Sequence, residues 1–269
     1  MPPLRALIFD VDGTLADTER DAHRVAFNDA FAELGLPFHW DVETYGQYLQ
    51  VTGGKERLRA YLQDHPQYPQ ISDAEIRRIH ARKTERYGEI IASGGIALRP
   101  GIARLLAEAQ EQDLLLAIAT TTTPANVEAL LHSTLGAQGW SRFQYIGAGD
   151  VVPHKKPAPD IYLHVLEKLG LSPQECLALE DSENGLHAAR DAGLEVIITQ
   201  TAYTAHQDFS GALCVLDHLG EAHSPATILS GPHKGEQAVI DLSWLRKWRE
   251  ENVDCRLRLG GGCPSGHDS

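Results

Sequence analysis

The chain has 269 residues, of which 42% are hydrophobic and 23% charged, values typical of one large or two modest globular domains. No apolar run approaches the length of a membrane-spanning helix, so we expect no membrane partner. The formal net charge of −13 argues against nucleic acid or an anionic membrane surface as the main partner. An anionic ligand would therefore need a local pocket of cationic side chains.

The cysteines and the N-terminal segment indicate the compartment. None of the four cysteines shows C-x-x-C spacing, and Cys176 and Cys214 lie in apolar runs, where we expect reduced core residues. Asp10 interrupts the first apolar run, which therefore lacks the form of a secretory signal. We expect a cytoplasmic protein, or one of the plastid stroma if a transit peptide precedes this sequence.

The first predicted strand leads directly into two carboxylates. Five of the six residues 4–9 are apolar, which favours a buried strand of a parallel sheet, and Asp10-Val11-Asp12-Gly13-Thr14 follows. Buried unpaired carboxylates are costly, so such groups usually bind a cation or take part in chemistry. The alternative is a surface turn at Asp12 and Gly13.

Residues 16–93 show helical patterns and no strand pattern. A two-proline loop at 65–69 and the Gly53-Gly54 pair interrupt them. Ser72 and Glu75 have the spacing of a capping box at the start of the last helix. The predicted helices span residues 17–35, 41–50, 55–64 and 72–91.

Beyond Gly94 and Gly95, predicted helices and strands alternate, which implies a parallel sheet covered on both faces. The predicted strands are 114–119, 145–148, 176–179, 195–199 and 212–216, and the predicted helices are 100–112, 124–135, 159–169, 183–192 and 242–250. We therefore predict an α/β fold, a Rossmann-like doubly wound parallel sheet with an inserted all-helical cap. The predicted core is 1–15 and 96–253, the cap is 16–95, and 254–269 is a disordered tail.

Four polar sites follow predicted strands, where ligands of open α/β sheets bind. They are Asp10 with Asp12, Thr120 with Thr121, Thr122 and Thr123, His154-Lys155-Lys156 before Pro157, and Glu180 with Asp181. Each has a simpler alternative: the threonines or the acidic pair could only cap helices, and the lysine could lie in a solvated loop. Their joint placement at equivalent strand ends favours one shared site.

The chemistry of these groups suits phosphoryl transfer. Such reactions need a nucleophile, neutralisation of phosphate charge and positioning. An aspartate can act as nucleophile and form an aspartyl-phosphate. Carboxylates are also ligands for Mg²⁺, while a lysine and a hydroxyl bind phosphate. The candidates are Asp10, Asp181 and Glu180 for the metal, Lys156 and Thr120 for phosphate, and Asp12 for acid/base work.

These motifs, in this order and spacing, resemble those of the haloacid dehalogenase-like hydrolases, and the insertion resembles their four-helix cap. Residues 18–28, 53–57 and 119–127 look like the CbbY-type sugar phosphatases. The resemblance implies that Asp10 is the nucleophile and Asp12 the acid/base. It also implies phosphate binding by Thr120 and Lys156, and Mg²⁺ held by Asp10, the Asp12 carbonyl and Asp181, with Glu180 close by.

The cap and the threonine run offer a second set of polar groups. Lys55 follows the Gly53-Gly54 pair at a helix start, an arrangement that resembles an anion cradle. Arg57 is a second candidate cation, although arginines on helices are more often solvated. The candidate substrate-binding residues are Glu19, His23, Lys55, Arg57, Thr121, Thr122 and Thr123.

Two phosphate sites a short sugar apart suit a pentulose bisphosphate. The CbbY-type resemblance implies xylulose 1,5-bisphosphate, a Rubisco-inhibiting misfire product, hydrolysed to xylulose 5-phosphate with Mg²⁺ as cofactor. The alternatives are a β-phosphoglucomutase-like phosphomutase and a phosphatase for phosphoglycolate or another small sugar phosphate. The intact motifs argue against a non-catalytic binding protein. We expect a monomer whose partner is a small sugar phosphate.

Overall fold

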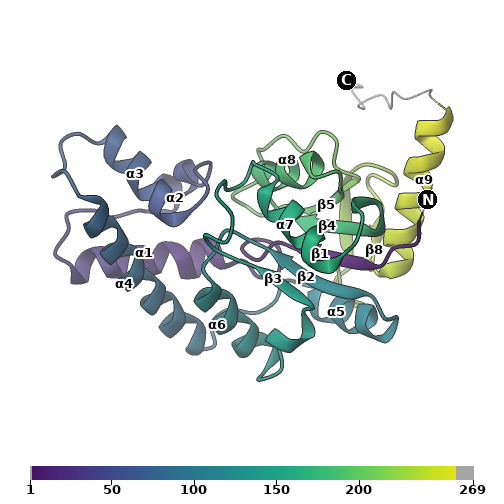
Figure 1. Cartoon of the computed structure of the whole chain (residues 1–269), viewed down its shortest axis with the longest axis horizontal. Coiled ribbons are helices and arrows are strands. Elements are labelled where there is room, and N and C mark those ends of the chain that lie inside the picture. The colour runs from purple at the N-terminus through teal and green to yellow at the C-terminus, as the bar shows by residue number, and fades with distance from the viewer. Residues whose placement is uncertain (1, 259–269) are drawn as a thin grey trace.

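The computed structural model describes residues 2–258, and its central feature is an eight-stranded sheet with the order β3-β2-β1-β4-β5-β6-β7-β8 (Figure 1). The strands are β1 (Ala6–Phe9), β2 (Leu115–Ala119), β3 (Tyr145–Gly147), β4 (Cys176–Glu180), β5 (Glu195–Thr199), β6 (Cys214–Leu216), β7 (Ala226–Ser230) and β8 (Gln237–Ala238). Strands β1 to β6 are parallel in the order 3-2-1-4-5-6 of doubly wound folds. The predicted fold class is confirmed.

The edge strands β7 and β8 are antiparallel and were not predicted. The connection from β6 to β7, residues 217–225, is shorter than the dozen or so residues that a parallel crossover needs, so the chain returns antiparallel. The missed signal was Thr227-Ile228-Leu229, a short apolar and β-branched run among turn residues.

Helices cover both faces of the sheet, as expected. They are α5 (Ile102–Glu111), α6 (Pro124–Leu135), α7 (Asp160–Leu169), α8 (Glu183–Asp191) and α9 (Leu242–Arg258). Side chains alternate along β1, so that Leu7 and Phe9 share one apolar cluster with α5, α6 and α9. Ala6 and Ile8 face the other cluster, with α7 and α8. The strand that delivers Asp10 is therefore buried on both faces.

The last helix is longer than the sequence pattern predicted. It continues past residue 250 to Arg258 and takes up residues 254–258 of the segment that we expected to be a disordered tail. The remainder of that segment, 259–269, lies outside the described residues.

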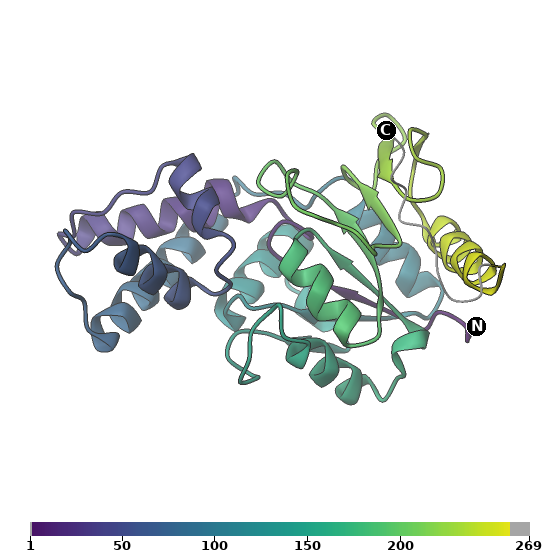
Figure 2. The same cartoon turned by 90° about the horizontal axis from the view of Figure 1, so that it is seen from above.

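The predicted cap forms a helical layer at one end of the elongated molecule, as both views show (Figures 1 and 2). Its helices are α1 (Arg24–Glu33), α2 (Val42–Tyr48), α3 (Gly54–Asp64) and α4 (Asp73–Ala92), and a π-helical turn, Glu19–His23, precedes α1. The cap has an aromatic cluster of its own around Phe27, Phe31 and Trp40. The capping box of Ser72 and Glu75 is present. Within residues 2–258, no helix is long and apolar enough to span a membrane.

Other cap residues pack into the main apolar core beside the sheet. Ala22, Ala26, Tyr87 and Ile91 belong to the same apolar cluster as the sheet. The two linkers to the cap are paired, since the Arg99 N–H donates to the Leu15 carbonyl at 2.8 Å. This packing holds the cap above the carboxyl end of β1, beside Asp10.

Candidate active site

The carboxyl edge of the sheet brings three of the four predicted motifs into direct contact. The Lys156 Nζ lies 2.7 Å from Asp10 Oδ1 and 2.5 Å from Glu180 Oε1, and it donates to the Ala119 carbonyl at 2.9 Å. Burial disfavours the charged lysine, but the two carboxylates raise its pKa above the ordinary value. Lys156 is therefore a fixed positive charge, positioned by three partners.

Asp10, Glu180 and Asp181 form a buried cluster whose oxygens lie within 4.8 Å of one another. Burial raises the pKa of Asp10 to about 7 although Lys156 lowers it. Burial and repulsion from Asp10 and Glu180 raise the pKa of Asp181 well above its ordinary value. The Lys156 ammonium and the Arg99 guanidinium, which acts to lower the pKa of Asp181, do not neutralise three carboxylates, so the cluster fits a divalent cation with oxygen ligands.

Gly13 makes room for this cluster. Its φ of +85° is a conformation that favours glycine, and a Cβ there would lie 2.1 Å from Asp181 Oδ2. Glycine at this position therefore allows both the turn and the close approach of the Asp181 carboxylate.

The Asp12 carboxylate points away from the cluster, toward the cap. It accepts hydrogen bonds from Thr18 Oγ1 at 2.5 Å and His23 Nε2 at 2.8 Å. Lys83 Nζ lies 2.5 Å from His23 Nδ1 and donates to it, so Nε2 carries the hydrogen given to Asp12. Burial opposes ionisation of Asp12, but His23, Thr18 and Lys83 together lower its pKa to about 2.

Sequence reasoning missed Thr18 and Lys83. Lys83 is 4% exposed, and burial lowers its pKa to about 8. Its signal was its position on α4, one turn from both Ile79 and Tyr87, which places a charge on the apolar face of the helix.

The threonine run serves both the site and the following helix. Thr120 is buried directly after β2 and its Oγ1 accepts from the Thr122 N–H at 3.3 Å. Thr123 caps α6 through the Asn126 N–H, as the alternative interpretation held. Thr121, Thr122 and Thr123 also line a pocket between cap and core.

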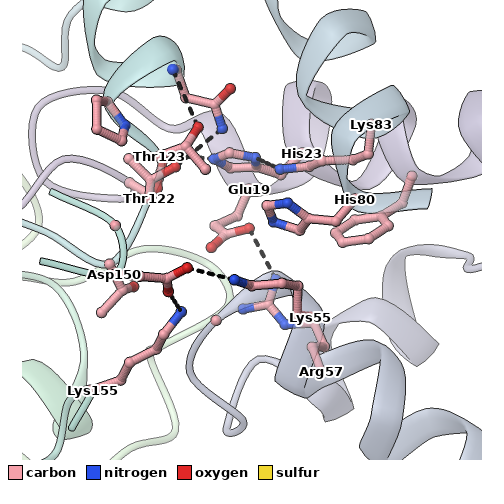
Figure 3. Close-up of a pocket in the computed structure, with 18 residues that line it drawn as sticks. Glu19, His23, Lys55, Arg57, His80, Lys83, Thr122, Thr123, Asp150 and Lys155 are labelled. Atoms are coloured by element: carbon pink, nitrogen blue, oxygen red, sulfur yellow. Dashed lines mark hydrogen bonds and ion pairs between the residues drawn. The ribbon is translucent and has the colours of Figure 1, made fainter. Parts of the chain in front are cut away.

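Two adjoining pockets share part of their lining. The catalytic pocket is lined by Asp10, Thr120, Lys156 and Asp181 among others. The distal pocket lies between cap and core and is lined by Glu19, His23, Lys55, Arg57, His80, Lys83, Thr121, Thr122, Thr123, Asp150 and Lys155 among others (Figure 3). Asp12, Glu19, Gly53, Arg57 and Thr121 line both pockets. A single ligand can therefore extend from one pocket into the other.

The two candidate cap cations occupy different environments. Lys55 Nζ lies 2.5 Å from Asp150 Oδ2 at the distal pocket, and its side chain is 23% exposed. Arg57 is buried, donates to the Tyr45 hydroxyl at 2.6 Å and lies 3.7 Å from Glu19. The alternative of a solvated Arg57 is therefore wrong, and Arg57 forms an ion pair with Glu19.

Besides Lys83, two titratable residues of the distal pocket were not singled out from the sequence, His80 and Asp150. Burial, with nearby Lys83, Lys55 and Lys155, lowers the pKa of His80 to about 3, so its imidazole is neutral. Lys155 was part of the third predicted polar site, directly before Lys156, but the sequence assigned it no role.

Comparison with known proteins agrees with this geometry. The family profile described as haloacid dehalogenase-like hydrolase matches residues 4–193, which include all four motifs. The chain belongs to the haloacid dehalogenase-like hydrolases. Within that family it is 51% identical to the plasmid-encoded protein CbbY of Cupriavidus necator over 251 residues, covering 91% of this chain and 96% of that protein.

Solved structures of this family agree as well. CbbY from Rhodobacter sphaeroides in complex with phosphate superimposes with a TM-score of 0.76 at 46% identity, over 85% of this chain and 97% of that one. An aspartate-to-asparagine variant of the same CbbY, in complex with xylulose 1,5-bisphosphate, matches with the same TM-score and identity, over 82% of this chain and 98% of that one. The chain is a CbbY-type phosphatase.

Proposed function

We propose that this sugar-phosphate phosphatase uses Mg²⁺ to hydrolyse xylulose 1,5-bisphosphate to xylulose 5-phosphate and orthophosphate, which removes an inhibitor of Rubisco. The observation that carries the proposal is the pair of adjoining pockets, both lined by lysine: Lys156 in one, and Lys55 with Lys83 and Lys155 in the other. Cations in both pockets of an acidic protein suit one phosphate group at each end of a short sugar. The xylulose 1,5-bisphosphate complex of the Rhodobacter sphaeroides CbbY supports the choice of sugar.

In the proposed reaction Asp10 is the nucleophile. Lys156 holds one carboxylate oxygen of Asp10, which orients the other for attack on phosphorus. The Asp10 oxygen forms a bond to phosphorus while the ester bond to the sugar oxygen breaks, and the sugar oxygen takes a proton from Asp12. Thr120 and Lys156 bind the transferring phosphoryl group, whose charge they partly offset.

Hydrolysis of the aspartyl-phosphate completes the cycle. Asp12 takes a proton from water as the water oxygen bonds to phosphorus, and the bond from phosphorus to Asp10 breaks. The low pKa of Asp12 suits this half, because an ionised carboxylate accepts the proton. The first half needs the protonated form, so we expect substrate to change the contacts of Asp12 with His23 and Thr18.

The residues that would hold Mg²⁺ are Asp10, Asp181 and the Asp12 carbonyl, with Glu180 close by. Their chemistry fits, since the buried carboxylates lack sufficient neutralising charge. When bound, the ion would offset the repulsion between the nucleophile and the phosphate. Glu180 already accepts from Lys156 and from the Tyr162 hydroxyl at 2.5 Å, which leaves Asp181 as the less encumbered carboxylate.

The test measures released phosphate from a panel of sugar phosphates with purified protein. We expect the highest kcat/KM for xylulose 1,5-bisphosphate, above ribulose 1,5-bisphosphate and above monophosphates, and no turnover with a chelator. Preference for phosphoglycolate or a hexose phosphate would refute the substrate. Conversion of a hexose 1-phosphate to its isomer in the presence of the hexose bisphosphate would instead indicate a phosphomutase.

A further inference from the structure

A charged bridge joins the cap to the core at the distal pocket. One carboxylate oxygen of Asp150 lies 2.5 Å from Lys55 Nζ, and the other lies 2.9 Å from Lys155 Nζ. Lys55 is in the first turn of α3, whereas Asp150 and Lys155 lie in the core loop between β3 and α7. Figure 3 shows Asp150 between the two lysines.

The exposure of these three side chains suggests that a ligand group can replace the Asp150 carboxylate between the two lysines. The Asp150 side chain is 61% exposed, while those of Lys55 and Lys155 are 23% and 16% exposed. The carboxylate therefore has the most access to solvent, while all three side chains line the distal pocket. Lys155 has a further contact to Glu56 at 3.4 Å, but Glu56 also pairs with Arg59 at 3.8 Å and is partly exposed.

We propose that Lys155 is a specificity-determining residue that, together with Lys55, binds the distal phosphate of the substrate in place of the Asp150 carboxylate. This inference deepens the proposed function and rests on it. The distal phosphate then joins cap to core, as Asp150 does without ligand. A monophosphate offers no such group and leaves the Asp150 bridge in place.

Phosphate is a better partner for two lysines than one carboxylate is. It offers three acceptor oxygens and up to two negative charges, and charge-assisted hydrogen bonds to it are strong. The contact contributes to discrimination because it exists only for ligands with a second phosphate. Closure of the cap on the core and recognition of a bisphosphate thus depend on the same two ammonium groups.

The experiment compares Lys155→Gln with wild type on xylulose 1,5-bisphosphate and on xylulose 1-phosphate, which lacks the distal phosphate. We expect KM for the bisphosphate to rise about tenfold or more beyond any change for the monophosphate, as loss of a charged hydrogen bond predicts. Lys155→Arg keeps the charge and should retain most of the discrimination. Lys168→Gln, an exposed lysine on α7, is the matched control and should change neither value.

A second variant tests the exchange itself. In Asp150→Asn the phosphate no longer has to displace an anion, so we expect KM for the bisphosphate to stay level or fall. A rise in KM equal to that of Lys155→Gln would show that the Asp150 bridge, and not phosphate binding, matters. Equal losses on both substrates in Lys155→Gln, through disturbance of Lys156, would also overturn the proposal.

Failure of the proposed function is distinguishable, because wild-type kinetics alone decide it. If the wild type prefers another bisphosphate, the choice of sugar is wrong. The Lys155 test then remains valid with that bisphosphate and the corresponding monophosphate that lacks the distal phosphate. A wild type that prefers xylulose 1,5-bisphosphate, combined with a Lys155→Gln variant that keeps the preference, sinks only the role of Lys155.

Discussion

The catalytic pocket and the distal pocket hold their charges in different ways. Lys156 is 6% exposed and has three hydrogen-bond partners, all in the core. Lys55 is 23% exposed on its side chain and pairs with one partner on the opposite side of the pocket. The first arrangement leaves little freedom, whereas the second can exchange partners. We infer that the chemistry of this phosphatase takes place at the sheet edge and that substrate choice depends on the cleft between cap and core.

Burial explains the difference in expected energetics. Charges in a low-dielectric interior interact strongly, and removing one partner leaves the other uncompensated. Exposed ion pairs contribute little to stability because water and salt screen them. Changes in the catalytic pocket should therefore affect the rate most, and changes in the distal pocket should affect KM for selected substrates.

The largest effect is expected from Asp10→Asn. The change keeps the shape of the side chain but removes the nucleophilic oxygen, so turnover should fall on the order of 10⁴-fold or more. Released phosphate measures the loss, and thermal unfolding shows whether the fold persists. A trapped phosphate analogue bonded to any residue other than Asp10 would refute the assignment.

A metal-site variant should have the next largest effect. Asp181→Ala should weaken the apparent Mg²⁺ affinity by at least ~10-fold, as loss of a metal contact commonly does. Calorimetric titration with Mg²⁺ measures this without turnover. Unaltered Mg²⁺ binding in the variant would exclude Asp181 as a ligand.

The same titration has an expected pH dependence. Asp10, with its pKa raised to about 7, and Asp181, with its pKa raised well above its ordinary value, hold protons that a cation must displace. The Mg²⁺ affinity of the wild type should therefore increase as the pH rises through about 7. Affinity that falls over this range would contradict proton competition at the carboxylate cluster.

Lys55 and Arg57 provide a contrast within the distal pocket. Lys55→Ala should raise KM for the bisphosphate about tenfold beyond its effect on xylulose 1-phosphate, because a charged hydrogen bond is lost. Arg57→Ala removes a buried partner of Tyr45 and Glu19, so it should also destabilise the fold by about 1–3 kcal/mol. Parallel thermal melts and kinetics separate the two. Identical behaviour of the variants would show that burial of Arg57 has no consequence.

The smallest effect is expected far from both pockets. Ser72→Ala removes the capping box of α4, which should cost about 1 kcal/mol. A slightly lower melting temperature with unchanged kcat/KM is the expected result. A marked loss of activity would show that the start of α4 is coupled to the site.

Much of the fold followed from local patterns in the sequence. The run 195–199 was predicted with the bounds that β5 has, and the helix at Pro124 begins where its cap residues indicated. Parallel strands end at one edge, so apolar runs that stop at Asp10, Thr120 and Glu180 were bound to bring those residues together. The short antiparallel β7 escaped prediction because few residues carry its pattern.

Only the tertiary structure decided which segments contact one another, because hydrophobic periodicity does not link segments that are distant in the sequence. Asp12 pairs with His23 because the π-helical turn brings the ring back toward the strand end, and Lys83 reaches it from a helix 60 residues further on. Lys55 meets Asp150 across 95 residues because the cap packs over the core. The sequence thus determined the catalytic motifs through their strand ends. The partners that set charge and substrate contacts depend on how two separately patterned segments pack, which local propensity does not specify.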